Sequence, residues 1–81
     1  MEVIKIYGVS DCPACLLAQA YAMDAYPKYE YVFINMDFAT AYRNGIKKKF
    51  NHQTYPIITI QDQYEEVLIG DSDNLKTFLS K

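Results

Sequence analysis

The sequence has 81 residues, of which 51% are hydrophobic and 22% charged, with a formal net charge of −2. This length and apolar content predict one small domain, residues 1–81, with a packed core, and exclude a disordered chain. The small net charge argues against a nucleic acid as partner. No apolar run approaches the roughly 18 residues that a membrane-spanning helix needs.

The first half of the chain predicts a strand, a helix and a second strand. Residues 3–7 (VIKIY) are almost continuously apolar, as is typical of a central strand covered on both faces. Pro13 suits the first turn of a helix, which the Tyr-Pro pair at residues 26–27 would end. Residues 29–35 (YEYVFIN) predict a second strand, parallel to the first. Three apolar residues repeat along one face of the helix, and we expect this face to be core: Leu16, Ala20 and Met23.

The second half predicts a helix, a β-hairpin and a last helix. Residues 39–50 form the helix pattern, although Gly45 interrupts it. Residues 56–60 (PIITI) and 64–69 (YEEVLI) predict two antiparallel strands. The last helix would run through Leu75, Phe78 and Leu79, with two candidate N-caps, Asp73 and Ser72. The order βαβαββα predicts an α/β fold, with a four-stranded mixed sheet and three helices on its two faces.

The only two cysteines form the sequence Cys12-Pro13-Ala14-Cys15, between the first strand and the first helix. At this position the positive end of the helix dipole and the unpaired backbone N–H groups favour a thiolate at the first sulfur. Such a thiolate attacks disulfides, and the second cysteine resolves the mixed disulfide. A ring closed by such near neighbours adds little stability. The pair therefore predicts redox chemistry rather than a structural bridge.

Two further segments complete a pattern with the cysteine pair. Thr54-Tyr55-Pro56 precedes the third predicted strand, and residues 69–75 (IGDSDNL) open the last helix. With these motifs the chain resembles the glutaredoxin family, a branch of the thioredoxin-like fold, over about residues 3–79. In size it is similar to small dithiol glutaredoxins of bacteria and phages. The resemblance implies a glutathione-dependent thiol–disulfide oxidoreductase that reduces protein disulfides and glutathione mixed disulfides.

The resemblance also implies roles for individual residues. Cys12 would be the nucleophile and Cys15 the resolving thiol, supported by Pro13 and by a cis Pro56 that faces the cysteines. Glutathione, a co-substrate rather than a bound cofactor, would contact Ala14, Thr54, Tyr55, Gly70, Asp73 and Asn74. The backbone of Tyr55 would pair with its cysteinyl part, and the last helix would receive its γ-glutamyl carboxylate through two amides, those of Asp73 and Asn74. The partner of its glycine carboxylate stays open among Lys47, Lys48, His52 and Gln53.

Three departures from the family pattern affect this site. Ala14 replaces a tyrosine, Asp71 replaces a glycine, and Asp73 adds a negative charge where a carboxylate would dock. Asp11 lies next to Cys12, and a neighbouring negative charge raises a thiol pKa. We therefore expect a less acidic Cys12 and weaker glutathione binding than in typical members.

Two other functions stay open. The acidic substitutions would suit a thioredoxin-like electron donor that thioredoxin reductase reduces. The thiols would alternatively serve a non-catalytic module as a metal or partner clamp, although two thiols and one histidine fall short of the four ligands of a zinc site. An intersubunit zinc or an iron–sulfur cluster shared by two chains stays open as well.

The compartment and the partners follow from the same features. The start of the chain reads as a strand rather than a signal peptide, so we expect a cytoplasmic protein, or one of the host cytoplasm if a phage encodes it. We expect a monomer with no bound metal and no contact with nucleic acid or membrane. The resemblance implies disulfide-containing client proteins, with ribonucleotide reductase as a frequent client of the family.

Overall fold

The computed structural model describes residues 2–37, 40–50 and 55–80. Within these residues the chain forms the predicted order βαβαββα, with element ends no more than two residues from those predicted. The elements are β1 (Val3–Gly8), α1 (Pro13–Ala25), β2 (Glu30–Asn35), α2 (Thr40–Phe50), β3 (Ile57–Gln61), β4 (Glu66–Gly70) and α3 (Ser72–Leu79). The predicted start of α2 at Ala39 lies outside the described residues.

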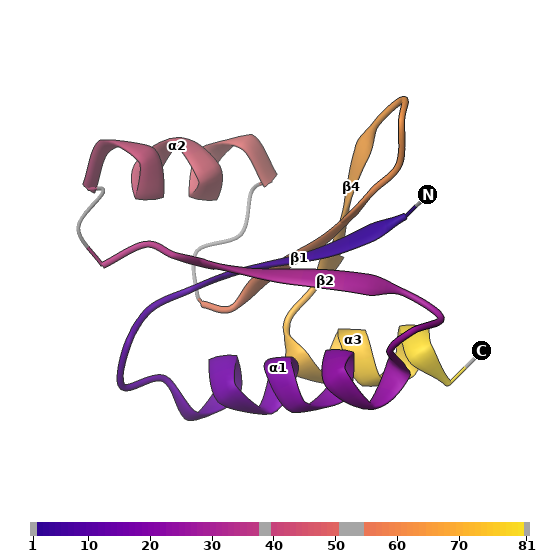
Figure 1. The fold of residues 1–81 in the computed structure, drawn as a ribbon. Helices are drawn as coiled ribbons and strands as arrows, with labels where there is room; N and C mark the ends of the chain where they lie inside the picture. Colours follow the sequence, from indigo (N-terminus) through magenta and orange to yellow (C-terminus); the bar gives the residue numbers. More distant parts are fainter. Residues whose placement is uncertain (1, 38–39, 51–54, 81) are drawn as a thin grey trace.

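The four strands form one mixed sheet in the order β2-β1-β3-β4. β1 pairs in parallel with β2 and antiparallel with β3, and β3 and β4 form the predicted antiparallel hairpin. The helices α1 and α3 cover one face of the sheet, and α2 covers the opposite face (Figure 1). The predicted α/β architecture, with a four-stranded mixed sheet and helices on both faces, is confirmed. Among the described residues, no helix combines the length and apolar character needed to cross a membrane.

Alternating residues of β1 and β3 build a core on each face of the sheet, because successive strand side chains point to opposite faces. The core between the sheet and the helices α1 and α3 is centred on Ile4, Ile6, Ala18, Ala22, Ile58 and Leu75. The core between the sheet and α2 is centred on Tyr7, Met36, Ile46 and Ile57. The prediction of a central β1 covered on both faces is therefore correct.

The predicted core face of α1 is wrong. The buried residues of this helix are Cys15, Ala18 and Ala22, whereas Leu16 and Met23 are 67% and 60% exposed and Ala20 is also exposed. Both sides of α1 are apolar, so the helical period fits either side. The small side chains face the sheet and let the helix pack close to it, and the large ones point outward.

The predicted N-cap of α3 is also wrong. The cap is Asp71, whose carboxylate accepts a hydrogen bond from the Asn74 N–H at 3.0 Å. In return the Asn74 side chain accepts one from the Asp71 N–H at 3.0 Å, which completes a capping box. Ser72 and Asp73 lie inside the first turn.

The carboxylate of Glu66 links β1, β3 and β4 on the face of the sheet that α2 covers. The Glu66 Oε2 atom accepts hydrogen bonds of 2.7 Å from the hydroxyls of Tyr7 and Thr59, and Lys49 Nζ lies 3.7 Å from its Oε1 atom. Burial alone raises the pKa of Glu66, but these hydrogen bonds, with the charges of Lys5 and Lys49, outweigh it and lower the pKa. The network therefore stabilises the folded state when Glu66 is ionised.

Glu66→Gln is expected to lower the free energy of unfolding at pH 7 by about 1 kcal/mol, since two buried hydroxyls lose a charged acceptor. A pKa that is lowered in the folded state confers stability above the unfolded pKa, about 4.3 for Glu, and this stability is lost as the pH falls through the folded value. Urea unfolding between pH 3 and 7 should therefore show a flatter pH dependence in the variant. Glu65→Gln, at the exposed neighbouring position, is the matched control. An unchanged pH dependence in Glu66→Gln would contradict this account.

Candidate redox site

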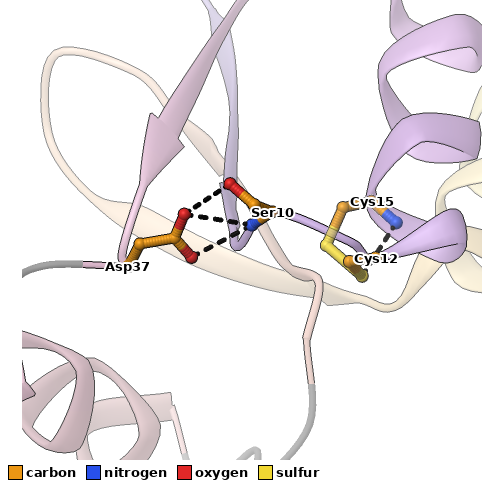
Figure 2. Close-up of a disulfide and its surroundings, with 4 residues drawn as sticks. All are labelled: Ser10, Cys12, Cys15 and Asp37. Carbon is orange, nitrogen blue, oxygen red and sulfur yellow. Dashed lines mark hydrogen bonds between the residues drawn. A yellow bond between two sulfur atoms is a disulfide. The ribbon is translucent and has the colours of Figure 1, made fainter.

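Cys12 and Cys15 are joined by a disulfide at the N-terminus of α1, with their Cα atoms 5.2 Å apart (Figure 2). Cys12 is the N-cap, with an extended backbone, and Pro13 occupies the first helical position, as predicted. The Cys15 N–H lies 3.2 Å from Cys12 Sγ. The Cys12 carbonyl also accepts the first backbone hydrogen bonds of the helix, from Cys15 at 3.0 Å and Leu16 at 3.1 Å. The helix N-terminus therefore presents a donor and its positive end to the first sulfur.

The two cysteines differ in exposure. Cys15 is 1% exposed, whereas Cys12 is half-buried and lies in a loop of exposed residues. A disulfide from another molecule can therefore approach Cys12, and Cys15 reacts only within the ring. This asymmetry favours Cys12 as the attacking sulfur.

Gly8, at the end of β1, makes room for the buried sulfur. A Cβ atom built at Gly8 would lie 2.9 Å from Cys15 Sγ and 2.7 Å from Cε2 of Phe33, both closer than ordinary packing allows. Only glycine therefore lets the strand and the disulfide meet. Gly8 belongs to none of the sequence motifs, and its place directly before the cysteine loop is the one signal of its role in the sequence.

A hydrogen-bonded clamp holds the cysteine loop against the end of β2. The Ser10 N–H donates to the two carboxylate oxygens of Asp37 at 3.0 and 3.3 Å, and the Ser10 hydroxyl donates to the same carboxylate (Figure 2). The pKa of Asp37 is lowered, chiefly by these bonds from the Ser10 side chain and backbone. Asp11, between the clamp and Cys12, adopts a left-handed conformation with φ 54°, which Asp tolerates better than most residues. Sequence reasoning missed this clamp, because 27 residues separate its two members.

The register of the sheet brings the three predicted motifs to one end. Tyr7 pairs with Ile57, and Ile58 pairs with Gly70, so the end of β1, the start of β3 and the end of β4 are neighbours. The cysteine loop, the segment before β3 and the N-terminus of α3 continue from these three ends. The topology therefore places the predicted site residues that the structure describes near one end of the sheet, where these strands meet.

The peptide bond between Tyr55 and Pro56 is cis, as the resemblance implied, and Pro56 is fully buried. Two cations lie over the Tyr55 ring, with Lys47 Nζ 5.0 Å and Arg43 Cζ 5.6 Å from its centroid. This places one predicted candidate for a carboxylate partner, Lys47, beside the segment before β3. Three other candidate residues, His52, Gln53 and Thr54, lie outside the described residues.

The N-terminus of α3 is partly occupied by its own cap. The Asn74 N–H, predicted to receive a ligand carboxylate, donates to Asp71. Gly70 has φ +128°, a conformation that favours glycine, and a Cβ there would overlap the Asn74 side chain. Asp73 and Asn74 are both exposed. A bound carboxylate would therefore have to compete with Asp71 for the Asn74 amide.

A cysteine pair at a helix N-terminus, beside the central strand of a mixed sheet, is the arrangement typical of the thioredoxin-like thiol–disulfide oxidoreductases. Within the described residues, no group of three or more His, Cys, Asp or Glu side chains is placed to hold a metal ion.

Comparison with known proteins agrees with this class. The chain matches glutaredoxin 1 from Francisella tularensis, in complex with cacodylate, with a TM-score of 0.66, 23% identity and all of both chains covered. A mutant of the thioredoxin-like protein BC3987 matches with a TM-score of 0.64 and 21% identity, over 94% of this chain and 97% of that one. These likenesses show the thioredoxin-like fold. A comparison with curated proteins gave no significant match.

The sequence itself matches the family model described as Glutaredoxin over residues 4–65. The chain therefore belongs to the glutaredoxin family. Family membership and the Cys12–Cys15 pair together support thiol–disulfide oxidoreductase chemistry.

Gly8→Ala is expected to destabilise the oxidised protein by about 1–3 kcal/mol, because its new methyl group has to displace the Phe33 ring or the Cys15 sulfur. Gly45→Ala in α2 is the matched control. Among the described residues, no atom outside the backbone of its own helix lies within 4 Å of the added Cβ, so this change should stabilise the helix by about 0.5–1 kcal/mol. Urea unfolding of both variants measures the difference. Equal stability of Gly8→Ala and the parent protein would contradict the close packing at the disulfide.

Proposed function

We propose that this protein is a glutathione-dependent oxidoreductase that reduces protein disulfides and glutathione mixed disulfides. The observation that carries the proposal is the Cys12–Cys15 disulfide at the N-terminus of α1, with one accessible and one buried sulfur. Family membership over residues 4–65 supports the same chemistry.

The reaction begins from the reduced pair. The Cys12 thiolate attacks one sulfur of the client disulfide, forms a Cys12–client disulfide and expels the other client sulfur as a thiolate. Cys15, after loss of its proton, attacks Cys12 Sγ, closes the Cys12–Cys15 disulfide and releases the second client sulfur. The client gains two electrons and takes up protons as its thiolates require. Two glutathione molecules then reduce the pair by the same exchange and leave as oxidised glutathione.

The backbone of α1 assists the first step. The Cys15 N–H that lies 3.2 Å from Cys12 Sγ would donate to the thiolate, and the helix end adds its positive potential. Asp11, next to Cys12 and exposed, acts in the opposite sense. We infer that Cys12 is a less acidic thiol than one without such a neighbour.

Glutathione would lie across the three neighbouring ends of the sheet. Its cysteinyl part would pair with the backbone of Tyr55 and contact Ala14. Lys47, which lies beside the Tyr55 ring, would attract a carboxylate. Its other carboxylate would reach Gly70 and the first turn of α3, where Asp73 and Asn74 lie. The Asp71 carboxylate competes at this last position, which supports weak glutathione binding.

The same competition favours a second candidate function. An electron donor that thioredoxin reductase reduces has no need of a carboxylate site on α3, and the Asp71 cap would then act only in stability. A non-catalytic metal or partner clamp is a third candidate, and a metal-content assay with a free-thiol count tests it.

The setting and the client are also proposals. A dithiol that has to be re-reduced after each cycle suits a reducing compartment such as the cytoplasm. Ribonucleotide reductase, which the family resemblance suggests as client, stays a prediction.

Substitution of the two cysteines is expected to separate the two steps. Cys12→Ser should abolish all activity, because Cys15 is too buried to attack a client. Cys15→Ser should keep the removal of glutathione from mixed disulfides, which needs one thiol, and lose the reduction of protein disulfides. Assays on a glutathionylated peptide and on a disulfide-bonded protein measure both. Activity retained in Cys12→Ser would refute the assignment of the nucleophile.

The reductant is identified by following NADPH consumption with a small disulfide substrate, either with glutathione and glutathione reductase or with thioredoxin reductase alone. We expect turnover in the first mixture. Asp71→Gly should lower the KM for glutathione several-fold, because it removes the competing carboxylate. Glycine is an acceptable N-cap, so the free energy of unfolding should fall by only a few tenths of a kcal/mol. Asp71→Asn, which keeps a good cap without the charge, separates charge from capping. Turnover with thioredoxin reductase alone would replace the proposal by the second candidate.

A further inference from the structure

The outward face of α1 is apolar although it is exposed to solvent. Leu16 is 67% exposed, Met23 is 60% exposed, and Ala20 lies exposed between them on the same side of the helix. We call these three residues the α1 stripe. No charged residue occurs in α1 before Asp24. The outward face of a surface helix normally carries charged and polar side chains, so this face differs from an ordinary solvated one.

The protein's own core does not account for the stripe. The sheet-facing side of α1 is already filled by Cys15, Ala18 and Ala22. A helix that is apolar on all sides is typical of a buried helix. The stripe is therefore suited to contact with another molecule.

The stripe begins at the redox site. With 3.6 residues per turn, Leu16 lies one turn beyond the N-cap Cys12, and Met23 lies on the same side two turns further along. Cys12 therefore directly precedes the stripe along the helix, with its sulfur bonded to the sheet-facing Cys15. A polypeptide whose disulfide reaches Cys12 can continue along α1 and contact Leu16.

We propose that the α1 stripe is the docking surface for disulfide-bearing client polypeptides, and that preferred clients carry apolar side chains next to their disulfide. This inference rests on the proposed thiol–disulfide exchange at Cys12, and the stripe acts before that step by holding the client. Exposed carboxylates, Asp11 and Asp24, flank the two ends of the stripe. They disfavour acidic clients and favour clients with a basic residue beyond the apolar ones.

The experiment uses two disulfide-bonded peptides of equal length and ring size. One carries Leu and Val beside its cysteines, and the other carries Ser and Asn. The fully reduced protein is mixed with each peptide, quenched with an alkylating reagent and analysed by mass spectrometry for the rate of Cys12–Cys15 oxidation. Because the same thiolate attacks both peptides, the ratio of the two rates cancels changes in the Cys12 thiol pKa. Dividing it by the ratio measured with dithiothreitol removes the peptides' own difference in disulfide reactivity, and what is left reports docking.

We expect the apolar peptide to react about tenfold faster, as for about 1.4 kcal/mol of added contact. Leu16→Ser and Met23→Ser should each bring the ratio toward one. Tyr64→Ser is the matched control, because Tyr64 is an exposed aromatic residue (85%) in the turn between β3 and β4, and its ratio should equal that of the parent protein.

The outcomes distinguish the inference from the proposed function. Equal rates for both peptides would overturn the docking surface and leave the oxidoreductase intact. Oxidation by neither peptide would overturn the proposed function and the docking surface with it. A dimer in sedimentation experiments that Leu16→Ser dissociates would show that a second copy of this chain covers the stripe, and this too would overturn the inference.

Discussion

The contact between Cys15 and Gly8 determines where the reactive end of α1 lies. Gly8 ends β1, which is hydrogen-bonded to strands on both sides and is held by the rest of the sheet. A buried sulfur against this glycine ties the first turn of the helix to the central strand. Ala18 and Ala22 continue the close contact along the helix. The outer sulfur, Cys12, is thereby kept half-buried at the surface, where a second molecule can reach it.

Two helix N-termini lie at the same end of the sheet, and they differ in which negatively charged group their first-turn amides can bind. The first turn of α1 directs an amide at Cys12 Sγ and can stabilise a thiolate there. The first turn of α3 is satisfied by its own Asp71 carboxylate. This contrast explains why disulfide chemistry follows from the site more directly than the choice of reductant. The chemistry depends on α1, whereas the proposed recognition of a glutathione carboxylate would depend on displacing the Asp71 carboxylate.

The predictions of the buried face of α1 and of the N-cap of α3 were wrong for the same reason. In α1 a stripe of large apolar residues and a stripe of small ones both repeat with the helical period, so periodicity cannot say which faces the sheet. At the start of α3, residues 71–73 (DSD) all have side chains that cap helices well. In each case the sequence offers several equivalent local solutions, and packing against the sheet selects one. The large residues left outside on α1 then become a feature of the surface beside Cys12.

The sequence by itself determined the order of the elements, the place of the cysteine pair between β1 and α1 and the family resemblance, because all of these depend on neighbouring residues. Only the tertiary structure decided the buried face of α1, the Ser10–Asp37 clamp and the Glu66 network. The clamp joins residues 27 positions apart, and the bond from Tyr7 to Glu66 joins residues 59 positions apart. Such contacts depend on which strands become neighbours in the sheet, and local propensity and period carry no information about that choice.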